Sequence, residues 1–217
     1  MRSTGFWVAG ILGMGLAAAA VQNPVEVIRS KDSELQKLLR DKEASKKTDR
    51  VKTLINGIFD FEELGRRALG PTTWGKMKPD QQSRFVKAFR EMVENSSVKK
   101  LDAYISDSTR YDAPDMGTDK AAVTAHVFSK GAESIVVYKL SLKQGSWKAW
   151  DLVIDDLSTA GNYGDQFKKI LQKSTMDGLI SKLEEKAKGS GASKSADNVK
   201  AKSEKSSQAA AKKTGGT

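Results

Sequence analysis

The sequence predicts an α+β fold, in which helices come first, an antiparallel sheet of three to four strands follows, and two helices end the domain. Between residues 24 and 104, apolar side chains recur at helical spacing. After Ser106 the pattern changes to segments rich in Val, Ile, Tyr and Trp. Short glycine-containing turns separate these segments, which is typical of hairpins and therefore of antiparallel pairing.

The first half of the chain carries the helical signals. One helix is predicted from Pro24 to about Glu43, and a second over residues 51–59, where apolar residues fall at i, i+3, i+4, i+7 and i+8. Asp60 is placed to cap a third, short helix that Gly70-Pro71 ends. A long helix is predicted to begin at Lys78-Pro79-Asp80. Its apolar stripe is Phe85, Phe89, Met92 and Val93, with Leu101 and Tyr104 further on.

The second half supplies the strands and two terminal helices. The turns between the main strands are Lys130-Gly131-Ala132 and Gln144-Gly145, both hairpin signals. The predicted strands are Ala121–Ser129, Ser134–Lys143 and Ser146–Ile154, with a weaker one at Thr109–Ala113, and the helices that follow are about Tyr163–Gln172 and Met176–Lys186.

The predicted strands carry apolar residues on both faces, whereas an antiparallel sheet with one wet face alternates cleanly. Strict alternation places Val136, Tyr138, Leu140 and Leu142 on one face and Ile135 and Val137 on the other. In the next strand it places Trp150, Leu152 and Ile154 opposite Trp147, Ala149 and Val153. Two arrangements satisfy this pattern: helices cover both faces, or one face lines a second apolar compartment.

The first twenty residues have the three-part form of a secretory signal peptide. Arg2 supplies the charge, an apolar stretch follows from Phe6 to Leu16, and alanines lead to a predicted cleavage after Ala20. The alternative is an uncleaved anchor, but the apolar run is short for a bilayer of about 30 Å.

The other end is a basic tail. Residues 188–217 hold seven lysines against Asp197 and Glu204, a net +5 that is half of the chain's +10. With so few apolar residues this tail is expected to be disordered and to act as a solubilising segment, with binding to an anionic surface as the alternative. The domain itself is predicted to span residues 21–187.

The composition excludes several kinds of site. There is no cysteine, so disulfides, thiolate metal sites and cysteine nucleophiles are absent. The single histidine, His126, rules out a multi-histidine metal site and leaves little room for a serine–histidine mechanism. No residue is singled out as catalytic, and we expect neither a metal nor a cofactor.

Four motifs in order resemble the MlaC family, whose members are also called toluene-tolerance or ABC-transporter auxiliary proteins. The resemblance covers about residues 24–187. The motifs are Phe59-Asp60-Phe61-Glu62-Glu63-Leu64 through Trp74 to Met77-Lys78-Pro79-Asp80-Gln81-Gln82, then Trp147 to Ser158, then Asn162-Tyr163-Gly164-Asp165-Gln166-Phe167, and Asp177-Gly178-Leu179-Ile180.

The resemblance implies a periplasmic phospholipid-binding protein with a curved antiparallel sheet wrapped by helices and a deep apolar pocket between them. Its implied partners are phospholipid as cargo, an inner-membrane ABC transporter with its tethered lipid-binding ring, and an outer-membrane lipoprotein complex. The chain departs from the family pattern at residues 95–98, where a tyrosine is usual, and at Gly164, where an arginine is usual. We expect a monomer that does not bind nucleic acid.

A lipid carrier needs apolar surface rather than acids, bases or metals, because each buried CH₂ group contributes about 0.8 kcal/mol against water. Plain core packing is the alternative for each candidate. The pocket candidates are Phe85, Phe89, Met92, Tyr104, Val127, Val136, Tyr138, Leu140, Trp150, Leu152 and Ile154.

Three other functions stay open at this point. A carrier of another apolar ligand, such as a hopanoid or isoprenoid, would have the same sequence features. A basic scaffold could bind nucleic acid through the tail, although the tail lacks aromatic residues to stack on bases. A hydrolase would need His126 as its base.

Overall fold

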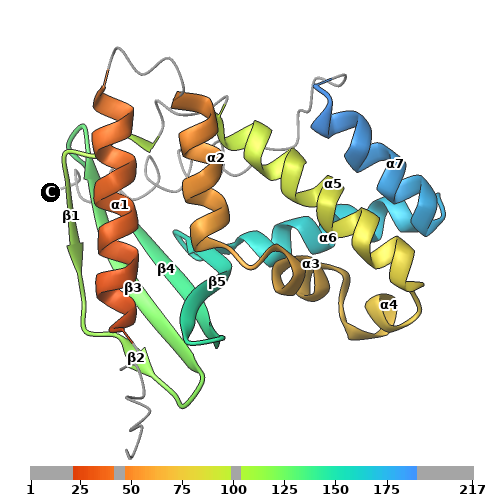
Figure 1. Cartoon of the computed structure of the whole chain (residues 1–217), viewed down its shortest axis with the longest axis horizontal. Helices are drawn as coiled ribbons and strands as arrows, with labels where there is room; N and C mark the ends of the chain where they lie inside the picture. The colour runs from red at the N-terminus through yellow and green to blue at the C-terminus, as the bar shows by residue number, and fades with distance from the viewer. Residues whose placement is uncertain (1–21, 42–46, 99–103, 190–217) are drawn as a thin grey trace, which may run out of the picture.

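The computed structural model describes residues 22–41, 47–98 and 104–189, and it confirms the α+β class (Figure 1). The predicted signal peptide, Leu101 and nearly all of the basic tail lie outside the described residues. The helices are α1 (Pro24–Arg40), α2 (Lys47–Ile58), α3 (Phe61–Leu69), α4 (Pro71–Gly75), α5 (Pro79–Val98), α6 (Thr159–Leu171) and α7 (Met176–Ala187). The strands are β1 (Ser108–Tyr111), β2 (Asp115–Met116), β3 (Lys120–Ser129), β4 (Ala132–Lys143), β5 (Ser146–Ile154) and β6 (Leu157–Ser158).

The strands form one open antiparallel sheet in the order β1-β3-β4-β5-β6, with β2 also paired to β3. Both predicted hairpins are confirmed, since Lys130 and Gln144 have positive φ and each precedes a glycine with positive φ. The sheet has four strands of at least four residues, as expected, and two short ones that the sequence did not reveal.

Helix ends follow local chemistry. The side chain of Asn23 caps α1, and Asp60 Oδ1 accepts a hydrogen bond from the Glu63 amide at 3.0 Å, as predicted for the start of α3. The helix α6 begins at Thr159, four residues earlier than predicted, because Ser158 accepts from the Gly161 amide at 3.0 Å. The short helix α4 was not predicted, since Gly70-Pro71 reads as a stop although Pro71 also suits a helix start.

One face of the sheet packs against α1, which lies across it in Figure 1. Val25 and Ile28 of α1 form a hydrophobic cluster with Val123 of β3, Leu140 of β4 and Trp147 of β5. The contact lies at the sheet end where α1 begins, because the Trp147 indole donates to the Gln22 carbonyl at 2.8 Å.

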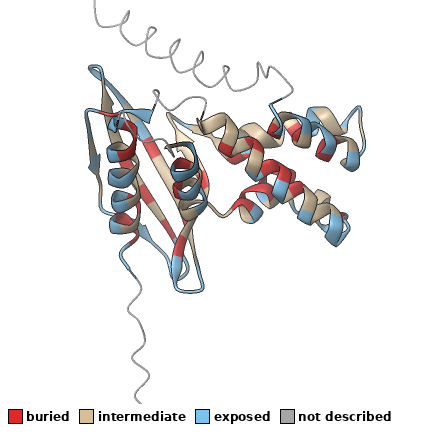
Figure 2. Cartoon of the chain, turned by 45° about the horizontal axis from the view of Figure 1, so that its top comes forward, coloured by how far each residue is buried: buried red, intermediate tan, exposed pale blue. Residues whose placement is uncertain are grey.

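The helices α3 to α7 form a second packed group beside β5 (Figures 1 and 2). Their common core contains Leu64, Phe85, Phe89, Phe167 and Ile180, each at most 2% exposed. Only α3 and α6 of this group contact β5 substantially. The chain enters the group along the outer edge of β5, where Phe59 forms a parallel bridge with Ala149.

Helices therefore do not cover both faces of the sheet completely. On the face away from α1, Trp150 of β5 meets Arg67 of α3. Further along that face, Ile135 of β4 is 45% exposed.

Candidate functional site

The pairing register assigns the candidate strand residues to faces, because residues directly opposite each other in an antiparallel pair share a face. Val136 of β4 lies opposite Ala125 of β3 and Ile154 of β5. Leu140, which packs on α1, lies opposite Ala121 and Ala149. The α1-facing side therefore carries the candidates Val127, Val136, Tyr138, Leu140, Leu152 and Ile154.

A β-bulge changes the expected alternation of β5. The register shifts between Lys139 and Leu140, so that Lys139 pairs with Asp151 while Leu140 pairs with Ala149. The prediction that Leu152 and Ile154 lie opposite Trp147 and Ala149 is therefore wrong: all four share the α1-facing side. An extra residue on one strand shifts the phase of every later side chain.

The bulge also separates Trp150 from its two predicted companions. Its ring lies under the Arg67 guanidinium at 3.6 Å and near the Lys139 ammonium at 5.5 Å. Lys139 and Asp151 pair with each other across the bulge, with the Lys139 ammonium 3.6 Å from a carboxylate oxygen. Trp150 therefore joins the sheet to α3 rather than facing α1.

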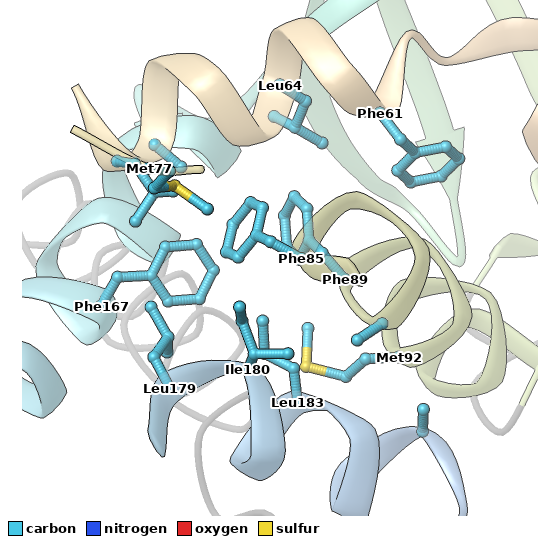
Figure 3. Close-up of a cluster of buried hydrophobic side chains, with 14 of the residues drawn as sticks. Phe61, Leu64, Met77, Phe85, Phe89, Met92, Phe167, Leu179, Ile180 and Leu183 are labelled. Carbon is cyan, nitrogen blue, oxygen red and sulfur yellow. The ribbon is translucent and has the colours of Figure 1, made fainter. Parts of the chain in front are cut away.

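The three candidates from the long helix lie inside the helical group (Figure 3). Phe85 and Phe89 are 0% exposed and Met92 is 6% exposed. The Phe89 ring makes edge contacts with Tyr163 at 4.8 Å and Phe167 at 5.5 Å. Tyr163 has its pKa raised to about 12, chiefly because burial disfavours the phenolate. These contacts are those of a closed core, and the role of the three residues in lipid binding stays a prediction.

The α1-facing side of the sheet is packed differently at the end away from the start of α1. Val127, Val136, Leu152 and Ile154 lie where β3 ends, β4 begins and β5 ends. All four are buried or half-buried. Among the described residues, however, none of them belongs to, or is packed against, the three hydrophobic clusters.

The helices nearest this end pack on one another instead. Leu38 of α1 forms a cluster with Val51 and Leu54 of α2, against which Leu35 and Val98 also pack. This separates α1 into two halves, one packed on the sheet and one packed on α2. An apolar strip of the sheet thus lies outside the hydrophobic clusters of the described residues, and apolar surface of this kind is what an acyl chain would need.

Tyr104 lies at the same end of the sheet, in a segment after α5 rather than on the helix as predicted. Its carbonyl accepts from the Gln36 side-chain amide at 2.8 Å, and the Ser106 carbonyl accepts from Arg40. The Tyr104 side chain is 41% exposed and that of Ile105 is 36% exposed. These bonds hold the segment against the last turns of α1.

Tyr138 and Tyr111 make a small polar spot on the otherwise apolar face under α1. The Tyr111 hydroxyl donates to Asp32 of α1 at 2.9 Å. Burial, and then the charge of Asp32, raises the pKa of both phenols, so both stay neutral at physiological pH. They supply neutral hydrogen-bonding groups, not acids or bases.

The polar residues singled out by their positions have structural partners. His126 lies between two carboxylates, with Nε2 2.9 Å from Asp112 and Nδ1 2.6 Å from Glu133. Asp151 is 1% exposed, and its carboxylate accepts from the Ser158 hydroxyl at 2.7 Å and the Ala160 amide at 2.9 Å. As expected for a buried carboxylate, it is hydrogen-bonded, here to the first turn of α6.

The cavities lined by described residues include one of about 610 Å³ between α3 and α6 and one of about 730 Å³ between α2, α3, α5 and the β4–β5 turn. Neither is lined by any of the eleven pocket candidates. Within 22–41, 47–98 and 104–189, no cluster of His, Asp and Glu could hold a metal ion, and no helix is long and apolar enough to cross a membrane.

Comparison with known proteins places the chain in a family. A family model described as MlaC protein matches residues 25–185, which is most of the chain. The chain belongs to the MlaC family. No curated protein matches it.

A solved structure shares the MlaC fold described above. It is a phospholipid-binding protein from Ralstonia solanacearum in complex with a phospholipid. It is 18% identical in sequence, and the similarity covers 77% of this chain and 98% of that chain with a TM-score of 0.67. At this level of identity the comparison establishes a common fold.

Proposed function

We propose that this MlaC protein is a periplasmic phospholipid carrier that moves lipid between inner- and outer-membrane complexes without catalysing a reaction. Family membership supports lipid binding, and so does the phospholipid in the structure of similar fold. The observation in this chain that carries the proposal is the apolar strip Val127, Val136, Leu152 and Ile154, which lies outside every packed hydrophobic cluster of the described residues.

The energetics of such a strip suit a carrier. Two acyl chains gain on the order of 20 kcal/mol on leaving water, at about 0.8 kcal/mol per CH₂ group. A bilayer already supplies that free energy, so the protein needs only to match it approximately. Branched aliphatic side chains do so without selecting one chain length, and the head group stays in water.

A pair of neighbouring residues gives a sharp test. Val136 faces the α1 side and is 9% exposed, whereas Ile135 faces the other side and is 45% exposed. The mature protein would be purified from a periplasm without detergent, and bound lipid would be measured by native mass spectrometry. Val136→Glu places a charge in the apolar strip and is expected to lose the lipid adduct, while Ile135→Glu is expected to keep it.

Circular dichroism and thermal unfolding would establish that both variants are folded. A folded Val136→Glu variant that retains lipid would show that the strip is not the binding surface. An unmodified mass for the wild type, with no uptake from liposomes, would overturn the carrier function itself. The mass of the adduct also separates a phospholipid from a hopanoid or another isoprenoid.

Leu140 is a less informative position for the same test. It is 1% exposed and packs against Val25 and Ile28 of α1. A glutamate there would detach α1 from the sheet, so loss of lipid would follow from loss of structure.

The proposed location and partners have their own tests. Mass spectrometry of the periplasmic protein is expected to give a chain beginning at Val21, as cleavage after Ala20 requires. Transfer of a fluorescent phospholipid between vesicles holding the inner- and outer-membrane complexes is expected to depend on the protein. If the lipid moved between the vesicles equally fast without the added protein, the shuttle role would be contradicted.

The absence of catalysis is part of the proposal. His126 is the only histidine in the sequence, and both of its ring nitrogens are engaged by carboxylates. Incubation with phospholipid is expected to leave the lipid intact. Hydrolysis that disappears in His126→Ala would contradict the proposal.

A further inference from the structure

The cavity between α3 and α6 is a cleft with an apolar floor. Its volume of about 610 Å³ is within the range of ligand-binding sites in proteins. Leu69 of α3 and Phe167 and Leu171 of α6 supply much of the apolar lining. The cleft shares no residue with the apolar strip of the sheet, so its occupant does not compete with lipid for the same side chains.

Two glycines of α6 have no side chains that could fill this cleft. Gly161 and Gly164 lie in its lining, one turn apart on α6. A Cβ atom at Gly164 would lie 2.8 Å from the Ala68 carbonyl oxygen of α3, so no larger residue fits there without moving the helices apart. The two helices approach closely at this point, and the space beside the contact stays unfilled.

Arg67 is held in a fixed position at one wall. Its Nε donates to Glu63 at 2.7 Å, and the central carbon of its guanidinium lies over the Trp150 ring, 3.6 Å from the ring centroid. The hydrogen bond from Arg66, and then that from Arg67, lowers the pKa of Glu63, so the pair stays ionised. Among the described residues, no partner is recorded for the terminal nitrogens of Arg67. A guanidinium held in this way loses little side-chain entropy when it binds a carboxylate.

Lys168 stands on the α6 side of the cleft. It is exposed, and within the described part of the chain no ion pair or hydrogen bond of its ammonium group is recorded. Asp165 is the one acidic residue in the lining, and Thr73 and Gln172 are neutral. The rim is thus net positive around an apolar floor, which complements an apolar group that carries a carboxylate.

We propose that the α3–α6 cleft is a docking site for an acidic, hydrophobic segment of a partner protein, with its apolar side chain on Leu69, Phe167 and Leu171 and its carboxylate between Arg67 and Lys168. The role as partner docking rests on the proposed carrier function, because a carrier must be recognised by the complexes that load and unload it. The binding chemistry of the cleft is independent of the cargo.

The test uses the full, lipid-loaded chain labelled with ¹⁵N. A blocked tetrapeptide with the sequence leucine–aspartate–glutamate–leucine is titrated while amide shifts are recorded. The amides of Gly161 and Gly164 are expected to move in a saturable way. The matched peptide leucine–asparagine–glutamine–leucine is expected to bind about tenfold more weakly, since it loses charge-assisted hydrogen bonds.

Neighbouring lysines on α6 provide the matched control. Lys168→Gln is expected to weaken binding of the acidic peptide about tenfold, and Lys169→Gln, which changes an exposed lysine outside the lining, less than twofold. Arg67→Gln is expected to act as Lys168→Gln does. Because Arg67 also packs on Trp150, the Lys168 pair decides the outcome if that variant fails to fold.

Three results would overturn the proposal: no shifts at Gly161 and Gly164, equal affinity for the two peptides, or equal effects of Lys168→Gln and Lys169→Gln. Native mass spectra of the same samples separate this proposal from the carrier function. Bound lipid without peptide binding would overturn only the docking site. Peptide binding by a chain that never holds lipid would uphold the cleft chemistry and overturn the carrier function.

Discussion

A Cβ atom on Gly164 would lie 2.8 Å from the carbonyl oxygen of Ala68, closer than such atoms approach in proteins. This is where α6 crosses α3, and it explains the departure from the family pattern at this position in terms of packing. The sequence resemblance implies an arginine there, but this chain uses the space for close contact of two helices. Backbone, not a flexible side chain, is the neighbour, so a larger residue must separate the helices.

Gly164→Ala is therefore expected to destabilise the protein by about 1–3 kcal/mol through overpacking. For a domain of this size that corresponds to a fall in melting temperature of roughly 2–4 °C per kcal/mol. Gly75→Ala is the control, because nothing lies within 4 Å of its Cβ position. Its melting temperature is expected to stay equal or rise slightly. Equal effects of the two substitutions would contradict the close contact.

Truncation at two candidate sites separates core from binding surface. Phe89 is 0% exposed in the helical core, so Phe89→Ala is expected to cost about 3–5 kcal/mol in lipid-free protein. Ile154 lies outside the packed clusters, so Ile154→Ala is expected to cost less than about 1.5 kcal/mol and to lower lipid retention. Urea unfolding of delipidated protein measures the first quantity and native mass spectrometry the second. The reverse ranking of stabilities would place Ile154 in the core.

Asp151 is expected to be the most costly polar residue to remove. Asp151→Ala leaves the Ser158 hydroxyl and the Ala160 amide without their buried acceptor, at about 1–3 kcal/mol or more. Hydrogen exchange should increase in the first turn of α6, because this carboxylate joins β5 to that helix. Glu185→Ala on the exposed side of α7 is the control and is expected to change stability by less than about 0.5 kcal/mol. Unchanged exchange in α6 would argue against the link.

The stability of the sheet should depend on pH through His126. Hydrogen bonds to Asp112, and then to Glu133, raise the pKa of His126 above its ordinary value of 6.5. A group with a raised pKa in the folded state stabilises the protein fully below its ordinary pKa, and this contribution is lost as pH rises through the raised value. Stability of the wild type relative to His126→Gln is thus expected to be constant around pH 5, well below 6.5, and to fall as pH rises through the raised pKa.

The acidic limb of the pH profile depends on Asp112, the hydrogen-bond partner of His126. The hydrogen bond from His126 lowers the pKa of Asp112, so its contribution is present above its ordinary value of 3.8 and disappears as pH falls through the lowered value. Urea unfolding between pH 3 and 9, with ring titration by NMR, measures both limbs. A His126 ring that titrates below 6.5 would contradict the arrangement.

The sequence predicted the elements that depend on local chemistry. Asp60 as a cap, the two glycine hairpins and the amphipathic stripe of Phe85 and Phe89 all follow from neighbours a few residues apart. These signals sufficed for the fold class and for the order of helices and strands.

Features set by long-range packing were not predictable in the same way. No local signal marks the bulge opposite Lys139, since it depends on which β4 residue each β5 residue pairs with. The sequence predicted Trp150, Leu152 and Ile154 on one face of the sheet. Because of the bulge, Trp150 lies on the face away from α1, and Leu152 and Ile154 lie on the α1-facing side. Likewise, the spacing of Phe89 and Met92 is the same for core and for pocket, and only the rings of Tyr163 and Phe167 from another helix show the close packing around Phe89.

The cleft between α3 and α6 was not predicted, for a related reason. Nothing in the sequence pattern relates Arg67 to Lys168. The two residues come near each other only because α3 and α6 cross. These helices are about ninety residues apart in the sequence. A glycine at position 164 was the one local hint, because it departs from the family pattern.

The chain segment that joins α2 to α3 also protects the molecule from self-association. The outer side of β5 would otherwise present free backbone groups, to which a strand of another molecule could add. The Asp60 amide donates to the Ala149 carbonyl at 2.8 Å, and β6 pairs with Val153 and Ile154 further along. At the opposite margin the sheet ends in β1, which has only four residues. With one margin covered and the other margin short, the sheet thus offers little template for amyloid-like growth.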